Sequence, residues 1–266
     1  MYNLEILEKG CEELGITLSD TQKNQFIRFY EYLVEKNKVM NLTGITEFDE
    51  VLVKHFLDSL CCVKAVDMGK IKTVMDIGTG AGFPGVPLKI AFPEVEACLL
   101  DSLNKRVKFL EETFALLGLE GISAIHGRAE EYAKNKAYRE KYDLCVSRAV
   151  SNLATLSEYC LPYVKEDGYF LPYKSGDIKE EAANSKKAVK TELINQTNSL
   201  KAKIEDLEKQ VGNLNESISS VEKRLKKTDN ISEELKQKWL PLLIGVPTAV
   251  QILSWTVYIL WQVLQK

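Results

Sequence analysis

Short apolar runs alternate with amphipathic stretches along most of the chain. Runs typical of buried strands cover 73–77, 96–101, 122–125, 142–146 and 169–174. The segments between them carry apolar residues at helical spacing. Strands that alternate with helices at this interval predict a parallel sheet with helices on both faces. The fold class is therefore predicted to be α/β.

Helical periodicity precedes the first of these runs. Apolar residues recur at helical spacing between residues 4 and 34, Ser19 is placed to cap a helix, and 48–66 forms another amphipathic stretch. We expect an N-terminal helical cap over 1–66, packed on a core domain over 67–183.

A seven-residue repeat begins after about residue 184. Aliphatic side chains occupy two positions of each repeat: Leu193, Leu200, Leu207, Leu214 and Val221 at one, and Ile204, Val211, Ile218 and Leu225 at the other. Leu at one position and β-branched residues at the other predict a parallel coiled coil over 184–236 and a homodimer through 193–225. The alternative is a single amphipathic helix docked on the domain, which the narrow stripe disfavours.

The last segment, 237–266, is apolar. Residues 239–264 contain no charged side chain, and this stretch is longer than the roughly 20 residues that span a bilayer. Tryptophans near both ends suit membrane interfaces, while Pro241 and Pro247 predict a kinked or shortened span. We expect a transmembrane helix or another membrane contact here. The alternative is a helix buried in an oligomer.

Composition and charge limit the classes of function. The chain has 266 residues, 45% hydrophobic and 27% charged, as in an ordinary folded protein. Its net charge is −3, with the acidic excess in the first 185 residues, which argues against indiscriminate nucleic-acid binding but allows a local basic patch.

The six cysteines lack C-x-x-C spacing, so neither a metal site nor a disulfide framework is indicated. This pattern favours a reducing compartment. No basic-then-apolar leader follows Met1, so the front of the protein is not expected to be secreted.

A glycine-rich turn follows the first predicted strand. Residues 73–87 read TVMDIGTGAGFPGVP, in which Gly78, Gly80 and Gly82 fit G-x-G-x-G. Glycines let the backbone turn sharply and approach a ligand closely. Taken alone this is a weak signal, because many turns need glycine.

Acidic residues near the turn strengthen the signal. Asp76 lies just before the glycines, where its carboxylate would hold a cationic or hydroxylated part of a ligand, and Asp101 ends the next strand. An acid at the latter place in a Rossmann-like sheet accepts hydrogen bonds from ribose hydroxyls. Ala129, Glu130 and Arg148 also follow strand ends. The sequence therefore predicts a nucleoside-cofactor site at this edge.

His55, one of only two histidines, lies in the amphipathic stretch KHFLDSL. A histidine invites a chemical role, but one beside an apolar face is more often a satisfied structural group. We favour the structural role.

Motifs in sequence order resemble those of a known family. They read NLTGI, KHFLDSL, DIGTGAGFPGVPLKI, LLDSLNKRVKFLE, GRAEEY, SRAVSNLATLSE and LPYKSG. Residues 1 to about 183 are similar to the glucose-inhibited division protein B family, also called ribosomal RNA small subunit methyltransferase G. Its members use S-adenosylmethionine to methylate N7 of a guanosine in bacterial 16S ribosomal RNA. The resemblance implies a class I methyltransferase fold, this cofactor, this substrate and a cytoplasmic location.

The resemblance and the strand-end positions together assign site residues. The predicted cofactor-binding set is Asp76, Gly78, Gly80, Phe83, Asp101, Ala129, Glu130 and Arg148. Arg148 and Lys174 are expected to act in the transfer step. Lys105, Arg106 and Lys174 are expected to contact RNA, since phosphate recognition requires cationic groups. For Lys105 and Arg106, the alternative that they only form an exposed first helical turn, without RNA contact, is equally well supported by the sequence.

The sequence departs from the family after the LPYKSG motif. Family members continue into two further strands, which the coiled-coil and apolar segments replace here. We therefore expect a sheet without its last two strands and with an exposed edge. Two hypotheses remain open: a ribosomal RNA methyltransferase, and a catalytically inactive, membrane-tethered dimer in which the methyltransferase part is a truncated relic.

Overall fold

The computed structural model describes residues 2–148, 151–174, 176 and 178–227, with only the backbone at 186–199, 222 and 224–227. The chain divides into two compact units, Met1–Val189 and Lys190–Lys266. The finer division predicted from the sequence, into 1–66, 67–183, 184–236 and 237–266, stays a prediction.

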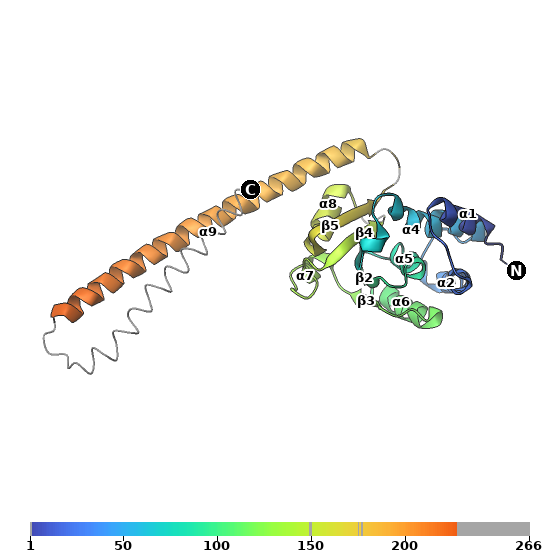
Figure 1. Cartoon of the computed structure of the whole chain (residues 1–266), viewed down its shortest axis with the longest axis horizontal. Helices are drawn as coiled ribbons and strands as arrows, with labels where there is room; N and C mark the ends of the chain where they lie inside the picture. The colour runs from blue at the N-terminus through green and yellow to red at the C-terminus, as the bar shows by residue number, and fades with distance from the viewer. Residues whose placement is uncertain (1, 149–150, 175, 177, 228–266) are drawn as a thin grey trace. The chain divides into compact units, whose positions relative to one another are not determined.

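A parallel sheet forms the centre of the first unit (Figure 1). Its five described strands lie in the order β3-β2-β1-β4-β5. Their bounds are β1 Thr73–Ile77, β2 Glu96–Asp101, β3 Ile122–His126, β4 Tyr142–Arg148 and β5 Val164–Tyr173. The predicted parallel α/β sheet is confirmed, and within the described residues the sheet ends at β5.

Strand β5 begins earlier than the predicted start at residue 169. Its first half is polar, and Asp167 adopts a left-handed φ of 62°. The pairing with β4 shifts register between Tyr142 and Leu144. This irregularity interrupts the alternation of apolar residues by which the sequence pattern identifies a strand.

Alternate residues of the central strands face two separate cores. Val74, Leu99 and Val146 belong to one apolar cluster, and Met75 and Leu100 belong to the other. Both faces of the sheet are therefore covered, as a parallel sheet requires.

Helices from the N-terminal region pack in the first cluster. They are α1 Glu5–Glu13, α2 Asp20–Met40, α3 Phe48–Val51, the π-helical η1 Leu52–Leu57, α4 Asp58–Leu60 and the 3-10 turns η2 Cys61–Lys64 and η3 Met68–Lys70, joined by α5 Gly85–Ala91 and α6 Asn104–Leu117. Ser19 caps α2 in a reciprocal capping box with Gln22. The π-helical turn within the predicted amphipathic stretch contains His55, and such turns occur frequently at functional sites.

The opposite face is covered by α7 Ala129–Tyr132, α8 Leu153–Cys160 and the 3-10 turn η4 Leu161–Tyr163. The sequence predicts α8 but not α7. Four residues are too few for helical periodicity to be recognised.

A buried carboxylate anchors the start of β1. Asp143, only 6% exposed, accepts hydrogen bonds from the backbone N–H groups of Lys72 and Thr73, both at 2.9 Å, and pairs with Lys165. Burial by itself would raise its pKa, but Lys165 and the bonds from Lys72 and Thr73 outweigh burial and lower the pKa to about 2.

Replacing Asp143 with alanine is expected to lower the free energy of unfolding at pH 7 by about 3 kcal/mol, because two backbone donors lose their acceptor. The folded-state pKa lies below the ordinary 3.8. The contribution of Asp143 is therefore complete above about pH 4 and is lost as the pH falls toward 2. Denaturant titrations across this range measure the effect, with the exposed Glu166→Ala as control. If the difference in unfolding free energy between wild type and Asp143→Ala does not shrink as the pH falls toward 2, the role assigned to Asp143 is wrong.

Helix α9, Lys179–Lys227, carries the seven-residue repeat as one continuous helix. Leu200, Leu207, Leu214 and Val221 are between 44% and 52% exposed. Among residues 2–227 as described, no helix is long and apolar enough to cross a membrane. The predicted membrane segment, 239–264, lies outside the described residues.

Candidate active site

A cavity of about 390 Å³ opens at the carboxyl ends of β1, β2 and β4. Its lining comes from the glycine loop, the strand ends and the N-terminal helical region: Leu42, Thr43, His55, Gly78, Thr79, Gly80, Ala81, Phe83, Asp101, Ser102, Arg106 and Arg148. Its volume is within the usual range for small-ligand sites. Of the predicted site residues, six line this one cavity: Gly78, Gly80, Phe83, Asp101, Arg106 and Arg148.

The glycine loop has the left-handed backbone that its sequence predicts. The φ angles of Gly78, Gly80 and Gly82 are 70°, 62° and 95°, which residues with a Cβ adopt at a cost. A Cβ added at Gly80 would meet no atom within 4 Å. The loop therefore leaves open space above its own backbone.

Asp76 lies beneath this loop. Its Oδ2 accepts hydrogen bonds from the Thr79 hydroxyl at 2.7 Å and from the Gly85 N–H at 2.9 Å. Burial raises its pKa to about 6, although these two bonds oppose the shift. Its Oδ1 has no partner among the described residues. Asp76 thus braces the loop, and it is not among the cavity-lining residues.

Asp101 lies at the end of β2 and is only 2% exposed. Its Oδ1 accepts from the Leu103 N–H and its Oδ2 from the Gly80 N–H, each at 2.9 Å. Arg106 Nη1 lies 3.4 Å from the same Oδ2. The carboxylate therefore fixes the loop and offers acceptor capacity at the cavity wall.

Arg148, at the end of β4, is the cationic group on the other side of the loop. It donates from Nη1 to Asp58 at 3.0 Å. Its guanidinium carbon lies 4.8 Å from the centroid of the Phe83 ring, a cation–π distance. These contacts orient the guanidinium within the cavity.

His55 is buried against the same ring. It stacks on Phe83 with ring centroids 4.5 Å apart, and its Nε2 lies 2.8 Å from the Thr43 hydroxyl. Burial first, and then the charge of Arg148, lower its pKa to about 4. His55 is therefore a neutral imidazole at pH 7. Its hydrogen bond agrees with the structural role favoured from the sequence, but His55 also lines the cavity.

Ala129 and Glu130, predicted to bind the cofactor, do not line the cavity. Ala129 is buried, and its carbonyl accepts a hydrogen bond from the Tyr163 hydroxyl at 2.7 Å. Glu130 is exposed and interacts with Tyr159. These two residues are therefore placed to reach only a ligand that extends beyond the cavity.

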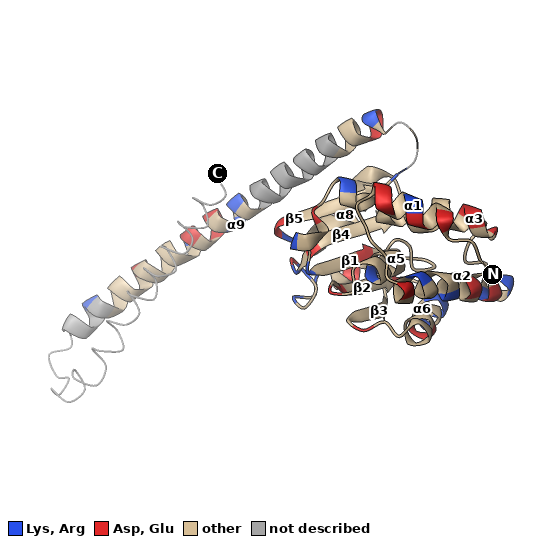
Figure 2. Cartoon of the chain, turned by 45° about the vertical axis from the view of Figure 1, so that its right-hand side comes forward, with Lys and Arg blue, Asp and Glu red and all other residues tan. Residues whose placement is uncertain are grey.

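Two of the predicted basic contacts also lie outside the cavity. Lys105 is exposed in the first turn of α6. Lys174 donates to the Ser151 carbonyl and pairs with Glu181, both at 2.8 Å. Helix α1 is mostly acidic, whereas acidic and basic residues are interspersed along α2 (Figure 2).

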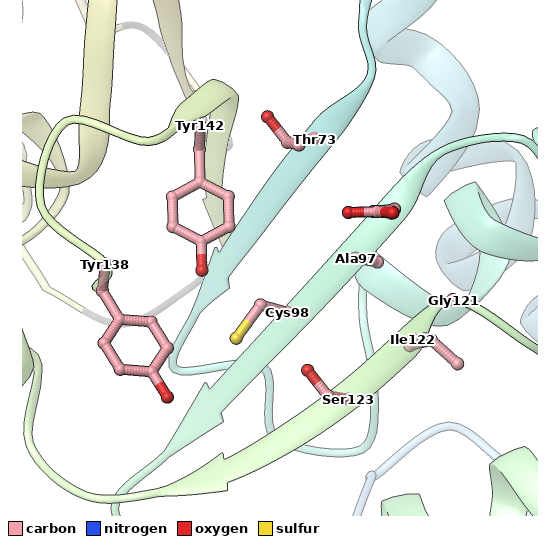
Figure 3. A pocket seen from close by; sticks show the side chains of 9 residues that line it. Thr73, Ala97, Cys98, Gly121, Ile122, Ser123, Tyr138 and Tyr142 are labelled. Carbon is pink, nitrogen blue, oxygen red and sulfur yellow. The ribbon is translucent and has the colours of Figure 1, made fainter.

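A second cavity, of about 360 Å³, lies over the beginnings of β1, β2 and β3. The rings of Tyr138 and Tyr142 direct their hydroxyl groups toward Cys98 and Ser123 there (Figure 3). Ligands of open α/β sheets bind at the opposite, carboxyl ends of the strands. This cavity contains none of the predicted site residues, and we assign it no part in the reaction.

Comparison with known proteins identifies the family. The family model described as rRNA small subunit methyltransferase G matches residues 22–212. The chain belongs to the ribosomal RNA small subunit methyltransferase G family. The match extends beyond residue 183, where the recognisable motifs end.

Relatives in the ribosomal RNA small subunit methyltransferase G family share about half of their residues with this chain. The protein of that name from Alkaliphilus metalliredigens is 52% identical over 189 residues, which cover 71% of this chain and 79% of the relative. The one from Lachnoclostridium phytofermentans is 52% identical over 181 residues, 68% of this chain and 75% of the relative.

A solved O-methyltransferase from Bacillus cereus in complex with SAH is 14% identical, with a TM-score of 0.43, and the match covers 54% of this chain and 64% of that one. The sheet order, the glycine loop after β1 and the family membership make this chain a class I S-adenosylmethionine-dependent methyltransferase by fold.

Several cavity residues were not predicted as site residues, namely Leu42, Thr43, His55, Thr79, Ala81 and Ser102. Thr79 and Ala81 alternate with the glycines of the loop, and Ser102 follows Asp101, so their neighbours in sequence give a signal. Thr43 and His55 belong to the NLTGI and KHFLDSL motifs, but no strand end or glycine turn in the sequence places them near the cofactor loop.

Proposed function

We propose that this protein is an S-adenosylmethionine-dependent methyltransferase that modifies N7 of a guanosine in small-subunit ribosomal RNA. The strongest support is that one cavity, in a member of this family, is lined by Gly80, Asp101 and Arg148, which come from three different chain segments. The alternative, an inactive relic, predicts a degraded site, whereas the loop, the acid and the cation are present together.

The cavity suits the cofactor. Asp101 would accept hydrogen bonds from the ribose hydroxyls, and the open space above Gly80 admits a ligand against the backbone. Asp76 has an unpartnered buried oxygen beneath the loop, which is proposed to attract the cationic part of the ligand. When bound, S-adenosylmethionine supplies an electrophilic methyl group on a sulfonium. The remaining roles proposed for Ala129 and Glu130 require the ligand to extend past the cavity toward α7.

The proposed chemistry needs alignment and no general base. Guanine N7 carries a lone pair and no proton, so the residues of this chain have to hold the base in line with the methyl group and exclude water. Arg148 is proposed to orient the base, since its guanidinium is already fixed by Asp58 and Phe83. Arg106 and Lys105 are proposed to contact RNA phosphates. The RNA contact proposed for Lys174 requires its ammonium to exchange Glu181 for a phosphate.

Calorimetric titration with S-adenosylmethionine tests the proposal at its first step. We expect binding with a dissociation constant on the order of 10 μM, within the usual range of substrate affinities. An absence of binding heat up to about 1 mM ligand, with a folded protein, would contradict the proposal and favour the relic.

We further propose that residues 193–225 pair with a second copy of the chain. Helix α9 is continuous through this region, and its leucines at 200, 207 and 214 are about half exposed. Lys203 and Glu208 occupy the flanking positions at which opposite charges pair across a parallel dimer. The exposed stripe would then be the seam between two helices.

Leu207→Lys is expected to convert the dimer into a monomer, because the substitution would bury an unpaired charge between the two helices. Light scattering after size-exclusion chromatography measures the mass. Glu205→Lys adds the same side chain on the outer face of the helix and is expected to leave the dimer intact. A wild-type protein that is monomeric at about 100 μM, a concentration at which coiled coils of this length associate, would refute the pairing.

A further inference from the structure

Three groups on the β4 side of the cavity form a chain of hydrogen bonds. Arg148 Nη2 lies 3.3 Å from His55 Nδ1, and His55 Nε2 lies 2.8 Å from Thr43 Oγ1. All three residues line the cavity. The direction of each hydrogen bond determines what Thr43 can offer to a ligand.

Arginine fixes the first direction. A guanidinium only donates, so the His55 Nδ1 that faces it carries the lone pair. The Lys54 carbonyl lies 3.1 Å from the same Nδ1 and would accept a proton from it. However, an N–H at Nδ1 would point at the permanent positive charge of Arg148, whose Nη2 lies 3.3 Å away and whose Nη1 also donates to that carbonyl. We therefore assign the proton of the neutral imidazole to Nε2.

Histidine then fixes the state of Thr43. The His55 Nε2–H donates to Thr43 Oγ1, and the backbone N–H of Ile45 donates to the same oxygen at 3.1 Å. A hydroxyl oxygen has two lone pairs and one proton, so both lone pairs are used. Among the residues that the structure describes, no acceptor receives the Thr43 proton. Thr43 is left as a hydrogen-bond donor at the cavity wall.

The position of Thr43 places this donor on the side of the cavity where the methyl-accepting base is proposed to bind. Asp101, the proposed ribose acceptor, ends β2, whereas Arg148, at the other end of the hydrogen-bonded chain, ends β4. Strands β2 and β4 pair with opposite edges of β1. A cofactor whose ribose is held at β2 leaves the β4 side of the cavity for the group that receives the methyl.

Guanine and adenine differ on the edge that carries N7. Guanine presents the acceptors N7 and O6, whereas adenine presents N7 and the donor N6 amino group. A hydroxyl with a free lone pair would serve either base, but one limited to donation serves only guanine. We propose that Thr43, held as an obligatory donor by His55, reads guanine O6 and so determines the specificity for guanosine. This inference rests on the proposed function.

The test uses two variants and two substrates. The target guanosine in a small-subunit ribosomal RNA is replaced by 2-aminopurine riboside, which keeps N7 but lacks O6. Wild-type enzyme is expected to methylate the modified RNA about tenfold to a hundredfold less efficiently, by kcat/KM, as befits one lost base contact. Thr43→Val, which removes the hydroxyl at similar size, is expected to lose a similar factor on guanosine and to treat both bases nearly alike. Thr43→Ser is expected to keep the wild-type preference.

His55→Phe tests the positioning role independently of Thr43→Val. Loss of the Nε2–H frees a lone pair on Thr43, so the hydroxyl can also accept from an amino group. The preference for guanosine over 2,6-diaminopurine riboside, which carries an N6 amino group in place of O6, is therefore expected to shrink while the affinity for S-adenosylmethionine stays within about threefold. A merely structural role for His55 would lower the rates on both bases by the same factor.

The outcomes separate this inference from the proposed function. If Thr43→Val keeps the full preference of wild type for guanosine, or binds S-adenosylmethionine at least tenfold more weakly, Thr43 does not read the base. If wild type methylates neither RNA at N7, the proposed function itself is wrong.

Discussion

Asp101→Ala is expected to weaken the binding of S-adenosylmethionine about a hundredfold. The carboxylate is buried and offers charged acceptors to the ribose hydroxyls, and hydrogen bonds to a charged group contribute about 1.5–3 kcal/mol each. The variant also releases the Gly80 N–H from its acceptor, so the loop loses a contact that shapes the cavity. Calorimetric titration measures the change in the dissociation constant.

Asp101→Asn separates these two effects. An asparagine keeps one oxygen that accepts from Gly80 but presents a donor in place of the second acceptor. We expect about a tenfold loss of cofactor affinity and a modest loss of thermal stability, because the Leu103 N–H then faces the new amide group instead of its acceptor. Glu5→Ala, which removes an exposed carboxylate on α1, serves as the control. Unchanged cofactor affinity in both Asp101 variants would contradict the ribose assignment.

Arg148→Ala is expected to lower kcat/KM for methyl transfer to ribosomal RNA at least a hundredfold. The guanidinium links Asp58, His55 and the Phe83 ring, so its loss disorders the wall that orients the base. Misplacement of a reacting group by about 1 Å costs on the order of a hundredfold in rate. Transfer of a labelled methyl group measures the loss.

A second substitution at the same site makes the result specific. Arg148→Lys keeps the positive charge but cannot contact Asp58 and His55 with one planar group, and we expect it to recover less than a tenth of the lost activity. Arg139→Ala removes an exposed arginine paired with Glu140 and is expected to retain full activity. If Arg148→Lys transfers methyl groups at the wild-type rate, positive charge alone suffices and the orienting role is wrong.

The sheet and one half of the site could be predicted because their signals are local. A strand, a glycine turn and an acid at the next strand end follow one another within 73–101, and parallel strands bring their carboxyl ends to one edge. Gly78, Gly80 and Asp101 are therefore found from the sequence. Asp76 is found in the same run, and its Oδ2 accepts from Thr79 and Gly85 beneath the loop, while its contact with the cofactor stays a prediction.

The other half of the site depends on tertiary packing. Thr43 and His55 reach the cavity only because the N-terminal helices pack on the same sheet face as α5, and periodicity does not determine that docking. His55 also lies in a π-helical turn, which shifts the helical phase and so changes which side chains face inward. Glu130 follows β3 and is exposed on the short α7 beside Tyr159, so its contact with the cofactor stays a prediction.

Mapping of the methyl group tests the central claim most directly. Unmethylated small-subunit ribosomal RNA is incubated with the full-length protein and S-adenosylmethionine, reduced with borohydride and treated with aniline, which cleaves RNA at 7-methylguanosine. We predict strand cleavage at one guanosine, absent without the cofactor and strongly reduced with Arg148→Ala. Intact RNA after incubation with a folded protein, or a methyl group recovered at an atom other than guanine N7, would contradict the account.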